Sequence, residues 1–197
     1  MNSFDKLAWV YNLVRGNTQR EYKLIKQSVQ LRKNQRVLDI GGGTGLIATQ
    51  LANDVKEVVV LDASSKMLDR IKDRRINKVV GFVQKIPFKT EEFDVVCLVD
   101  AFHHFTNGCP KREWDKLIGR SVSEILRVLK KDGQLVMVEF NPQTFIGRLI
   151  KFLENKIMGF GSQFYQPNDL KKLFESDCNI EVFNSKSFCY ALTITKK

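Results

Sequence analysis

Apolar positions along the chain change their period repeatedly, and these changes predict alternating strands and helices. Short runs rich in valine, isoleucine and leucine, bounded by polar residues or glycine, are typical of buried strands. Longer segments place apolar residues three and four positions apart, which is typical of amphipathic helices. The predicted strands are 36–40, 55–61, 78–84, 93–99, 134–140, 179–185 and 187–195. The predicted helices are 4–14, 18–31, 45–53, 65–72, 113–130 and 167–176.

The order of these elements predicts how they assemble. Strands and helices alternate up to residue 140, which favours a parallel sheet with helices on both faces. Two strands then follow the last helix with almost nothing between them, and such a hairpin makes one terminal strand antiparallel. We therefore predict an α/β fold: a Rossmann-like, seven-stranded, mostly parallel sheet with a terminal antiparallel hairpin strand. No repeat or linker divides the sequence, so residues 1–197 are interpreted as one domain.

Two local signals predict where helices begin and end. Thr18 and Glu21 have the spacing of a capping box, in which each side chain accepts from a backbone N–H at the start of a helix. Helix 113–130 carries the clearest apolar stripe, and Gly133 follows it as a helix terminator would.

Composition and charge narrow the class of protein. Hydrophobic residues make up 43% and charged residues 27%, as in a globular protein. No apolar run reaches membrane-spanning length and the start lacks the order of a signal peptide, so a cytoplasmic location is expected. A net charge of +10 attracts nucleic acid, anionic lipid or acidic small molecules, unless it only solvates the surface. The cysteines are far apart, with only His103 and His104 as companions, so no metal site or disulfide is expected.

The strongest local signal is the sequence VLDIGGGTG at residues 37–45, which joins a predicted strand to a predicted helix. Its glycines allow a tight turn and leave no side chain between the backbone and a ligand. The following helix presents N–H groups and a positive dipole end at the carboxyl ends of the strands. Dinucleotide-binding loops carry a further glycine where Leu46 stands, which argues against a dinucleotide-dependent oxidoreductase.

A second candidate is Asp62, which follows the second predicted strand 17 residues after Gly45. A carboxylate at this position can accept hydrogen bonds from both hydroxyls of a ribose. The alternative role, capping the next helix, belongs more naturally to Ser64 or Ser65. We therefore predict that Asp62 binds a ribose.

Taken in order, the motifs of the chain resemble those of the class I S-adenosylmethionine-dependent methyltransferases, especially the small-molecule branch that includes the ubiquinone/menaquinone methyltransferases. They are VLDIGGGTG at 37–45, LDASSKM at 61–67, IPF at 86–88, FDVV at 93–96, FHH at 102–104 and EILRVLK at 124–130. The start, with Phe4, Asp5, Tyr11 and Asn12, is similar to the start of the quinone enzymes. The resemblance implies a methyltransferase whose cofactor is S-adenosyl-L-methionine.

The resemblance also implies roles for single residues. The loop glycines would pack against the methionine part of the cofactor, and Asp39 would orient the loop or reach the amino group through water. Asp62 would hold the ribose, and Asp100 would lie near the amino acid end. Ala63 and Met67 would lie beside the adenine. The residues implied at the cofactor are Asp39, Gly41, Gly42, Gly43, Thr44, Gly45, Asp62, Ala63, Met67, Phe82, Val83 and Asp100.

One position departs from the family pattern. Phe82 lies five residues before Pro87, where the family often has an Asp or Asn that bonds the adenine amino group. Either a backbone group near Val83 replaces that contact, or the ring of Phe82 stacks on the adenine.

The reaction asks the protein chiefly to align the acceptor and exclude water, because the cofactor supplies the methyl group. An acceptor that is a hydroxyl or an acidic carbon also needs a base. His103 and His104 follow the fourth predicted strand, and we predict that His104 is the catalytic base. The alternative is that these histidines only pack beside the pocket.

Two segments are expected to cover the site: an N-terminal helical segment, 1–31, and a substrate-side insertion, 141–166. Within the insertion, apolar residues alternate with Arg148, Lys151 and Lys156. This mixture suits an apolar or membrane-derived acceptor and peripheral contact with a membrane. The alternative is that the segment packs its apolar side onto the sheet.

Three functions follow from these observations. The prediction is a methyltransferase for a small acceptor. A methyltransferase acting on RNA through the basic surface, and a cofactor-binding module without turnover, are the alternatives. Asp100-Ala-Phe-His does not match the Asn/Asp-Pro-Pro-aromatic motif of adenine- and glutamine-directed methyltransferases. Adenine bases and glutamine side chains are therefore less favoured as acceptors.

Overall fold

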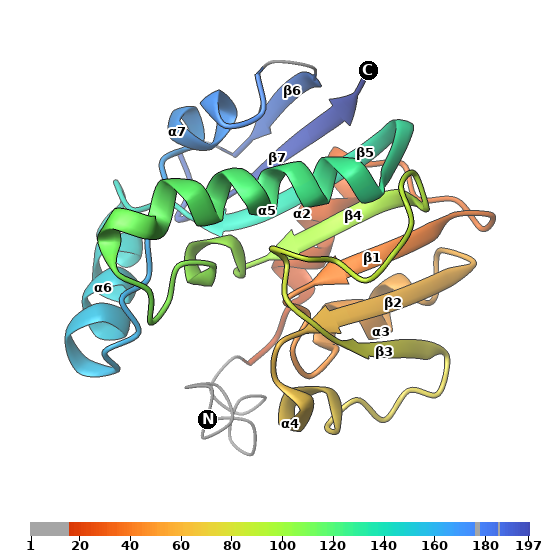
Figure 1. The fold of residues 1–197 in the computed structure, drawn as a ribbon, viewed down its shortest axis with the longest axis horizontal. Helices are drawn as coiled ribbons and strands as arrows, with labels where there is room; N and C mark the ends of the chain where they lie inside the picture. The colour runs from red at the N-terminus through yellow and green to blue at the C-terminus, as the bar shows by residue number, and fades with distance from the viewer. Residues whose placement is uncertain (1–15, 176–177, 185) are drawn as a thin grey trace.

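Seven strands form one sheet in the order β3-β2-β1-β4-β5-β7-β6 (Figure 1). The computed structural model describes residues 16–175, 178–184 and 186–197, so the predicted helix 4–14 lies outside the described residues. The strands are β1 Arg36–Ile40, β2 Glu57–Asp62, β3 Ile76–Val80, β4 Phe93–Val99, β5 Leu129–Phe140, β6 Cys178–Phe183 and β7 Cys189–Lys196.

The strand directions confirm the predicted fold. β3, β2, β1, β4 and β5 pair in parallel with one another along the sheet. β7 lies between β5 and β6 and is antiparallel to both, with Thr193 opposite Val136 on one side and Glu181 on the other. The chain is therefore an α/β protein with a seven-stranded, mostly parallel sheet and one antiparallel strand.

Helices cover both faces of this sheet, because alternate residues of each strand point to opposite sides. On one face, Leu38 belongs to the same buried cluster as Ile125 of α5 and Leu170 of α7. On the other face, Val37 belongs to a cluster with Ile25 of α2 and Leu51 of α3. None of the helices in the described ranges is long and apolar enough to cross a membrane. The helices and helical turns are α2 Gln19–Ser28, α3 Leu46–Leu51, α4 Ser65–Leu68, η2 Phe102–His104, η3 Lys111–Glu113, α5 Trp114–Val128, α6 Phe145–Phe152, η4 Leu153–Ile157 and α7 Pro167–Lys172.

Of the two predicted helix signals, the first is right in position, since α2 begins directly after Thr18, but lacks the predicted side-chain bond, and the second is wrong. The side chain of Thr18 makes no capping bond to α2, and its hydroxyl instead accepts a hydrogen bond from Nε2 of Gln50 at 2.8 Å. α5 passes directly into β5 at Leu129, so Gly133 lies inside the strand. There a side chain is excluded by packing, because a Cβ on Gly133 would lie 2.8 Å from the carbonyl oxygen of Lys130.

Candidate active site

A cavity of about 760 Å³ opens where β1, β2 and β4 end, and most of the predicted site residues line it. Asp39, Gly42 and Thr44 instead line a separate cavity of about 30 Å³ beside α3. Gly45 caps the start of α3 and lines neither cavity. The predicted residues in the wall of the larger cavity are Gly41, Gly43, Asp62, Ala63, Met67, Phe82, Val83, Asp100 and His104.

The loop after β1 needs glycine for two different reasons. Gly41 has a φ of 71°, a left-handed conformation, and a Cβ there would lie 2.7 Å from the Cβ of Ala101. Gly42 approaches the side chain beneath it so closely that a Cβ would lie 2.4 Å from Oδ2 of Asp39. The result is a loop whose bare backbone forms one wall of the cavity at Gly41 and Gly43.

Asp39 is buried beneath this loop. Burial, reinforced by the negative charge of Asp62, raises the pKa of Asp39 to about 7. Within the described part of the chain, its Oδ2 has no hydrogen-bond partner. The position of Asp39 is suited to supporting the loop rather than to facing the larger cavity.

Asp62 joins the loop to the start of α4. Its Oδ2 accepts a hydrogen bond from the backbone N–H of Gly43 at 2.9 Å, and its Oδ1 accepts from that of Ser64 at 2.8 Å. Ser64 itself caps α4, since its Oγ accepts from the N–H of Met67 at 3.2 Å. Ser64 therefore fills the capping role that the sequence allowed it, and the carboxylate of Asp62 faces the cavity.

Phe82 and Val83 lie in a turn, because β3 ends at Val80 and not within the predicted strand 78–84. The N–H of Lys85 donates to the carbonyl oxygen of Phe82 at 3.0 Å and closes this turn. The side chain of Phe82 is 64% exposed although it is aromatic, while Val83 is buried. The ring of Phe82 is thus available at the cavity wall.

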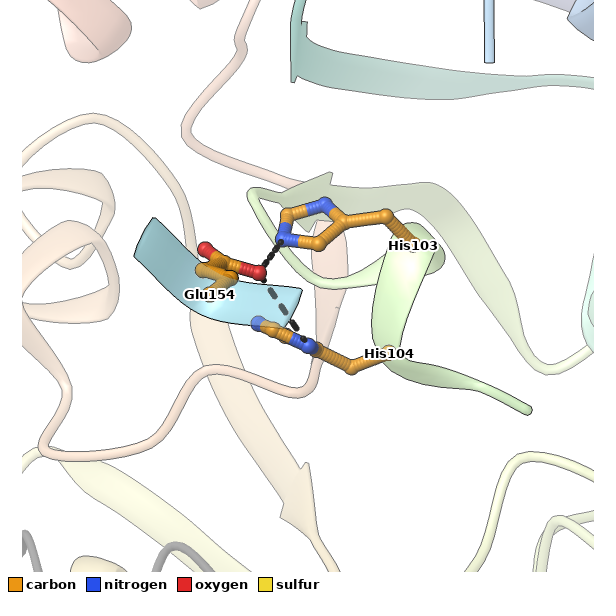
Figure 2. Close-up of side chains that lie close together, drawn as sticks. All are labelled: His103, His104 and Glu154. Carbon is orange, nitrogen blue, oxygen red and sulfur yellow. Dashed lines mark ion pairs between the residues drawn. The ribbon is translucent and has the colours of Figure 1, made fainter. Parts of the chain in front are cut away.

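Two histidines on the turn η2 meet a carboxylate from η4 (Figure 2). Nε2 of His103 lies 3.6 Å from Oε2 of Glu154, and Nδ1 of His104 lies 3.9 Å from the same oxygen. On its other side, Nδ1 of His103 lies 2.5 Å from Oε2 of Glu139. Nδ1 of His104 also contacts Oγ of Ser162 at 2.9 Å. In the described part of the chain, His103, His104 and Glu154 also have the donor types to ligate a metal ion.

The two imidazoles carry different charges. Burial lowers the pKa of His103, but the carboxylates of Glu139 and Glu154 outweigh burial and raise it to about 10. Burial, together with the charge of His103, lowers the pKa of His104 well below its usual 6.5. At neutral pH, therefore, His103 is cationic and His104 is neutral.

Glu139 and Glu154 are the functional candidates that sequence reasoning missed. Glu139 is buried near the end of β5 and also accepts from the N–H groups of Ala101 and Phe102, at 3.2 and 2.8 Å. Its signal in the sequence is a carboxylate in an otherwise apolar strand, LVMVEF at 135–140. Glu154 had no comparable signal, because its burial depends on how η4 packs against η2.

We expect Glu139→Gln to lower the free energy of unfolding by about 3 kcal/mol, because it leaves the His103 cation buried beside one carboxylate instead of two. The measurement is urea unfolding at pH 7. Glu181→Gln on the exposed side of β6 is the matched control, with an expected change below about 0.5 kcal/mol. Equal changes in the two variants would contradict the importance of this ion pair.

Residues 38–137, about half of the chain, match the model of a family described as "Methyltransferase domain". The chain belongs to this family. The methyltransferase domain also has a fold similar to that of a SAM-dependent methyltransferase of Thermotoga maritima, with a TM-score of 0.78, 19% identity and 99% of each chain covered. These findings confirm the resemblance to class I S-adenosylmethionine-dependent methyltransferases.

Curated relatives of the methyltransferase domain include two demethylmenaquinone methyltransferases. The protein of Renibacterium salmoninarum is 33% identical over 149 residues, which cover 72% of this chain and 59% of that protein. The protein of Thermotoga maritima is 30% identical over 166 residues, which cover 77% of this chain and 67% of that protein. The matched region thus spans about three fifths to two thirds of these relatives.

Proposed function

We propose that the chain is a cytoplasmic methyltransferase that uses S-adenosylmethionine to methylate a small apolar acceptor by in-line transfer. The composition of the cavity wall carries this proposal. The wall combines the bare backbone of the glycine loop and the carboxylates of Asp62 and Asp100 with many apolar side chains and two histidines. The volume of about 760 Å³ lies in the range of about 300–1,000 Å³ that is typical of small-molecule sites. The names of the two relatives support a quinone-like acceptor.

On the cofactor side, the residues present fit S-adenosylmethionine. Asp62 would hold the ribose, because its carboxylate lines the cavity and a carboxylate oxygen can accept more than one hydrogen bond. Ala63 and Met67 would lie along the adenine, and the exposed ring of Phe82 would stack on it.

The loop itself would face the amino acid end of the cofactor. Gly41 and Gly43 present bare backbone there, and Asp100, which follows the neighbouring strand β4, also lines the cavity. Asp39, Gly42, Thr44 and Gly45 would keep the loop in shape from behind. When bound, the cofactor supplies an electrophilic methyl group on its sulfonium.

On the acceptor side, the wall is apolar and partly built by the segment 141–166. No lysine or arginine lines the cavity among the described residues, and the cation of His103 is already paired with Glu139 and Glu154, so the wall offers little to a phosphate-rich RNA substrate. The apolar residues of this side are Phe105, Leu117, Phe140, Ile150, Leu153, Met158 and Phe160.

We assign His104 as the base that takes the acceptor's proton. A neutral imidazole can accept a proton, whereas His103 already carries one under the influence of Glu139 and Glu154. Because His104 is a weak base, the acceptor must lose its proton readily, as a phenol or an activated ring carbon does. Glu154, 3.9 Å from Nδ1 of His104, would stabilise the imidazolium that forms.

The activity can be tested with a demethylated naphthoquinol and radiolabelled S-adenosylmethionine. We expect label in the quinol and none in total RNA, with the second product being S-adenosylhomocysteine. Label in RNA alone would favour the RNA alternative. Binding of cofactor without transfer to any acceptor would favour the binding module.

The rate of methyl transfer should stay level as the pH is lowered from about pH 8 to 6.5. His104 has a depressed pKa, so its neutral form persists until the pH falls well below 6.5. Single-turnover rates at saturating cofactor measure this directly. A loss of rate centred near pH 6.5 would indicate a histidine with an unshifted pKa and would contradict the assignment.

A further inference from the structure

The outer side of α6 and η4 carries a concentration of exposed apolar side chains. Among the described residues, ten large hydrophobic side chains are strongly exposed; six of them belong to this segment and a seventh, Met158, follows it directly. These seven are 37% to 74% exposed. We call them the outer stripe: Phe145, Ile146, Leu149, Phe152, Leu153, Ile157 and Met158.

This stripe is not the side that the segment uses to pack. Five of its members, Phe145 and the residues one, four, seven and eight positions after it, have the spacing of one helix face. The other two, Ile157 and Met158, lie at the end of η4 and directly after it. The opposite face carries Gly147, which packs so closely that a side chain there would overlap the backbone oxygen of Asn141. Ile150 and Glu154 lie on the same opposite face and line the cavity. The alternative, in which the segment packs its apolar side onto the sheet, is therefore wrong for the outer stripe.

Cations accompany the stripe. Arg148, Lys151 and Lys156 are exposed on the same segment, and none of them forms an ion pair with a described residue. Glu154, the only acidic residue of the segment, points inward to His103. An apolar stripe flanked by cations is typical of helices that lie in the interface of a membrane with anionic lipids.

We propose that the outer stripe docks on an anionic lipid bilayer, and that the acceptor enters the cavity from that bilayer. This inference rests on the proposed apolar acceptor. Leu153 and Met158 are both exposed and part of the cavity wall, so the stripe and the cavity are continuous. A second copy of the chain is a poorer occupant, because it would bring identical cations together on a protein of net charge +10.

The position of α6 in the fold agrees with docking on a membrane. α6 lies at one end of the molecule, on the side toward which the parallel strands point, and projects beyond α5 (Figure 1). The turn η4, which continues α6, is a π-helix, a form that is frequent at functional sites.

The test is co-sedimentation of the full chain with two kinds of vesicle, phosphatidylcholine alone and phosphatidylcholine mixed with phosphatidylglycerol in equal parts. We expect strong partitioning only to the anionic vesicles. Neutralising Arg148, Lys151 and Lys156 together by substitution with Gln should weaken it about 100-fold, since each cation contributes about fivefold. The apolar variant, Phe145→Ser with Phe152→Ser and Ile157→Ser, should weaken it at least as much.

A matched control removes the same charge elsewhere. Lys131→Gln, Lys171→Gln and Lys172→Gln neutralise three exposed lysines outside the segment, and should leave partitioning within about threefold. An equal loss in this control, or equal binding to both kinds of vesicle, would overturn the proposal. The proposal would also be overturned if the wild-type chain bound neither kind of vesicle. It would be overturned as well if analytical ultracentrifugation showed a dimer of the wild type that is absent in the apolar variant.

Failure of this inference is distinguishable from failure of the proposed function. Cofactor affinity and methyl transfer to a short-chain, water-soluble quinol are measured without vesicles and need no docking. We expect the apolar variant to keep both within about threefold of the wild type while losing activity on a quinol embedded in vesicles. Transfer to the soluble quinol without vesicle binding would reject the docking surface alone.

Discussion

Asp62→Ala is expected to weaken binding of S-adenosylmethionine by about 100-fold or more. The variant removes the carboxylate that we propose accepts from two ribose hydroxyls, and each such charge-assisted bond would contribute about 1.5–3 kcal/mol. It also removes the bonds that tie Gly43 to Ser64, so the loop loses a support on the cavity side. Titration calorimetry with S-adenosylmethionine and S-adenosylhomocysteine measures both effects.

The nearby Asp69→Ala is a suitable control, because Asp69 is an exposed carboxylate just after α4. It should bind both compounds like the wild type. Asp62→Asn keeps one acceptor oxygen, so its affinity for the cofactor should lie between those of Asp62→Ala and Asp69→Ala. If Asp62→Ala bound the cofactor normally while retaining its melting temperature, the ribose assignment would be wrong.

His104→Gln is expected to lower kcat for methyl transfer by about 10²–10⁴-fold, the usual range for losing a general base. Gln can still bond Ser162 and Asn107 but accepts no proton at neutral pH. Cofactor affinity should change little, since the predicted cofactor groups follow β1, β2, β3 and β4 and none of them belongs to η2. Single-turnover kinetics at saturating cofactor provide the measurement.

Acceptors of different acidity test whether His104 acts as the base, because an acceptor that is already deprotonated needs none. With a more acidic quinol analogue, the difference between the wild type and His104→Gln should shrink, because less proton transfer remains for the base. A constant difference across acceptors of different acidity would indicate that His104 only packs against the site. No loss at all in the variant would remove it from the mechanism.

Much of the fold could be predicted because the period of apolar residues follows directly from how strands and helices bury their faces. The glycine loop was equally accessible, since Gly41 and Gly42 are required by the local backbone and by Asp39 beneath them. Asp62 was found because the end of a parallel strand meets such a loop at one edge of the sheet.

What could not be predicted depends on contacts between distant segments. β3 ends at Val80 because that residue pairs with Asp62, the last residue of β2, although apolar residues continue in the sequence. The hydroxyl of Thr18 accepts from Gln50, 32 residues away, and makes no capping bond to α2. The ion pair of His103 with Glu139 joins residues 36 positions apart, and local patterns carry no information on it.

The two sides of the cavity come from different parts of the chain. Groups proposed for the cofactor follow β1, β2, β3 and β4, whereas Ile150, Leu153 and Met158 of the acceptor side belong to one continuous stretch between β5 and α7. Because the stretch between β5 and α7 is continuous in sequence, it can be exchanged as a unit. A chimaera that receives residues 141–166 from a relative should inherit the acceptor preference of the donor while keeping the recipient's own cofactor site, which gives a family of this fold a short route to new substrates.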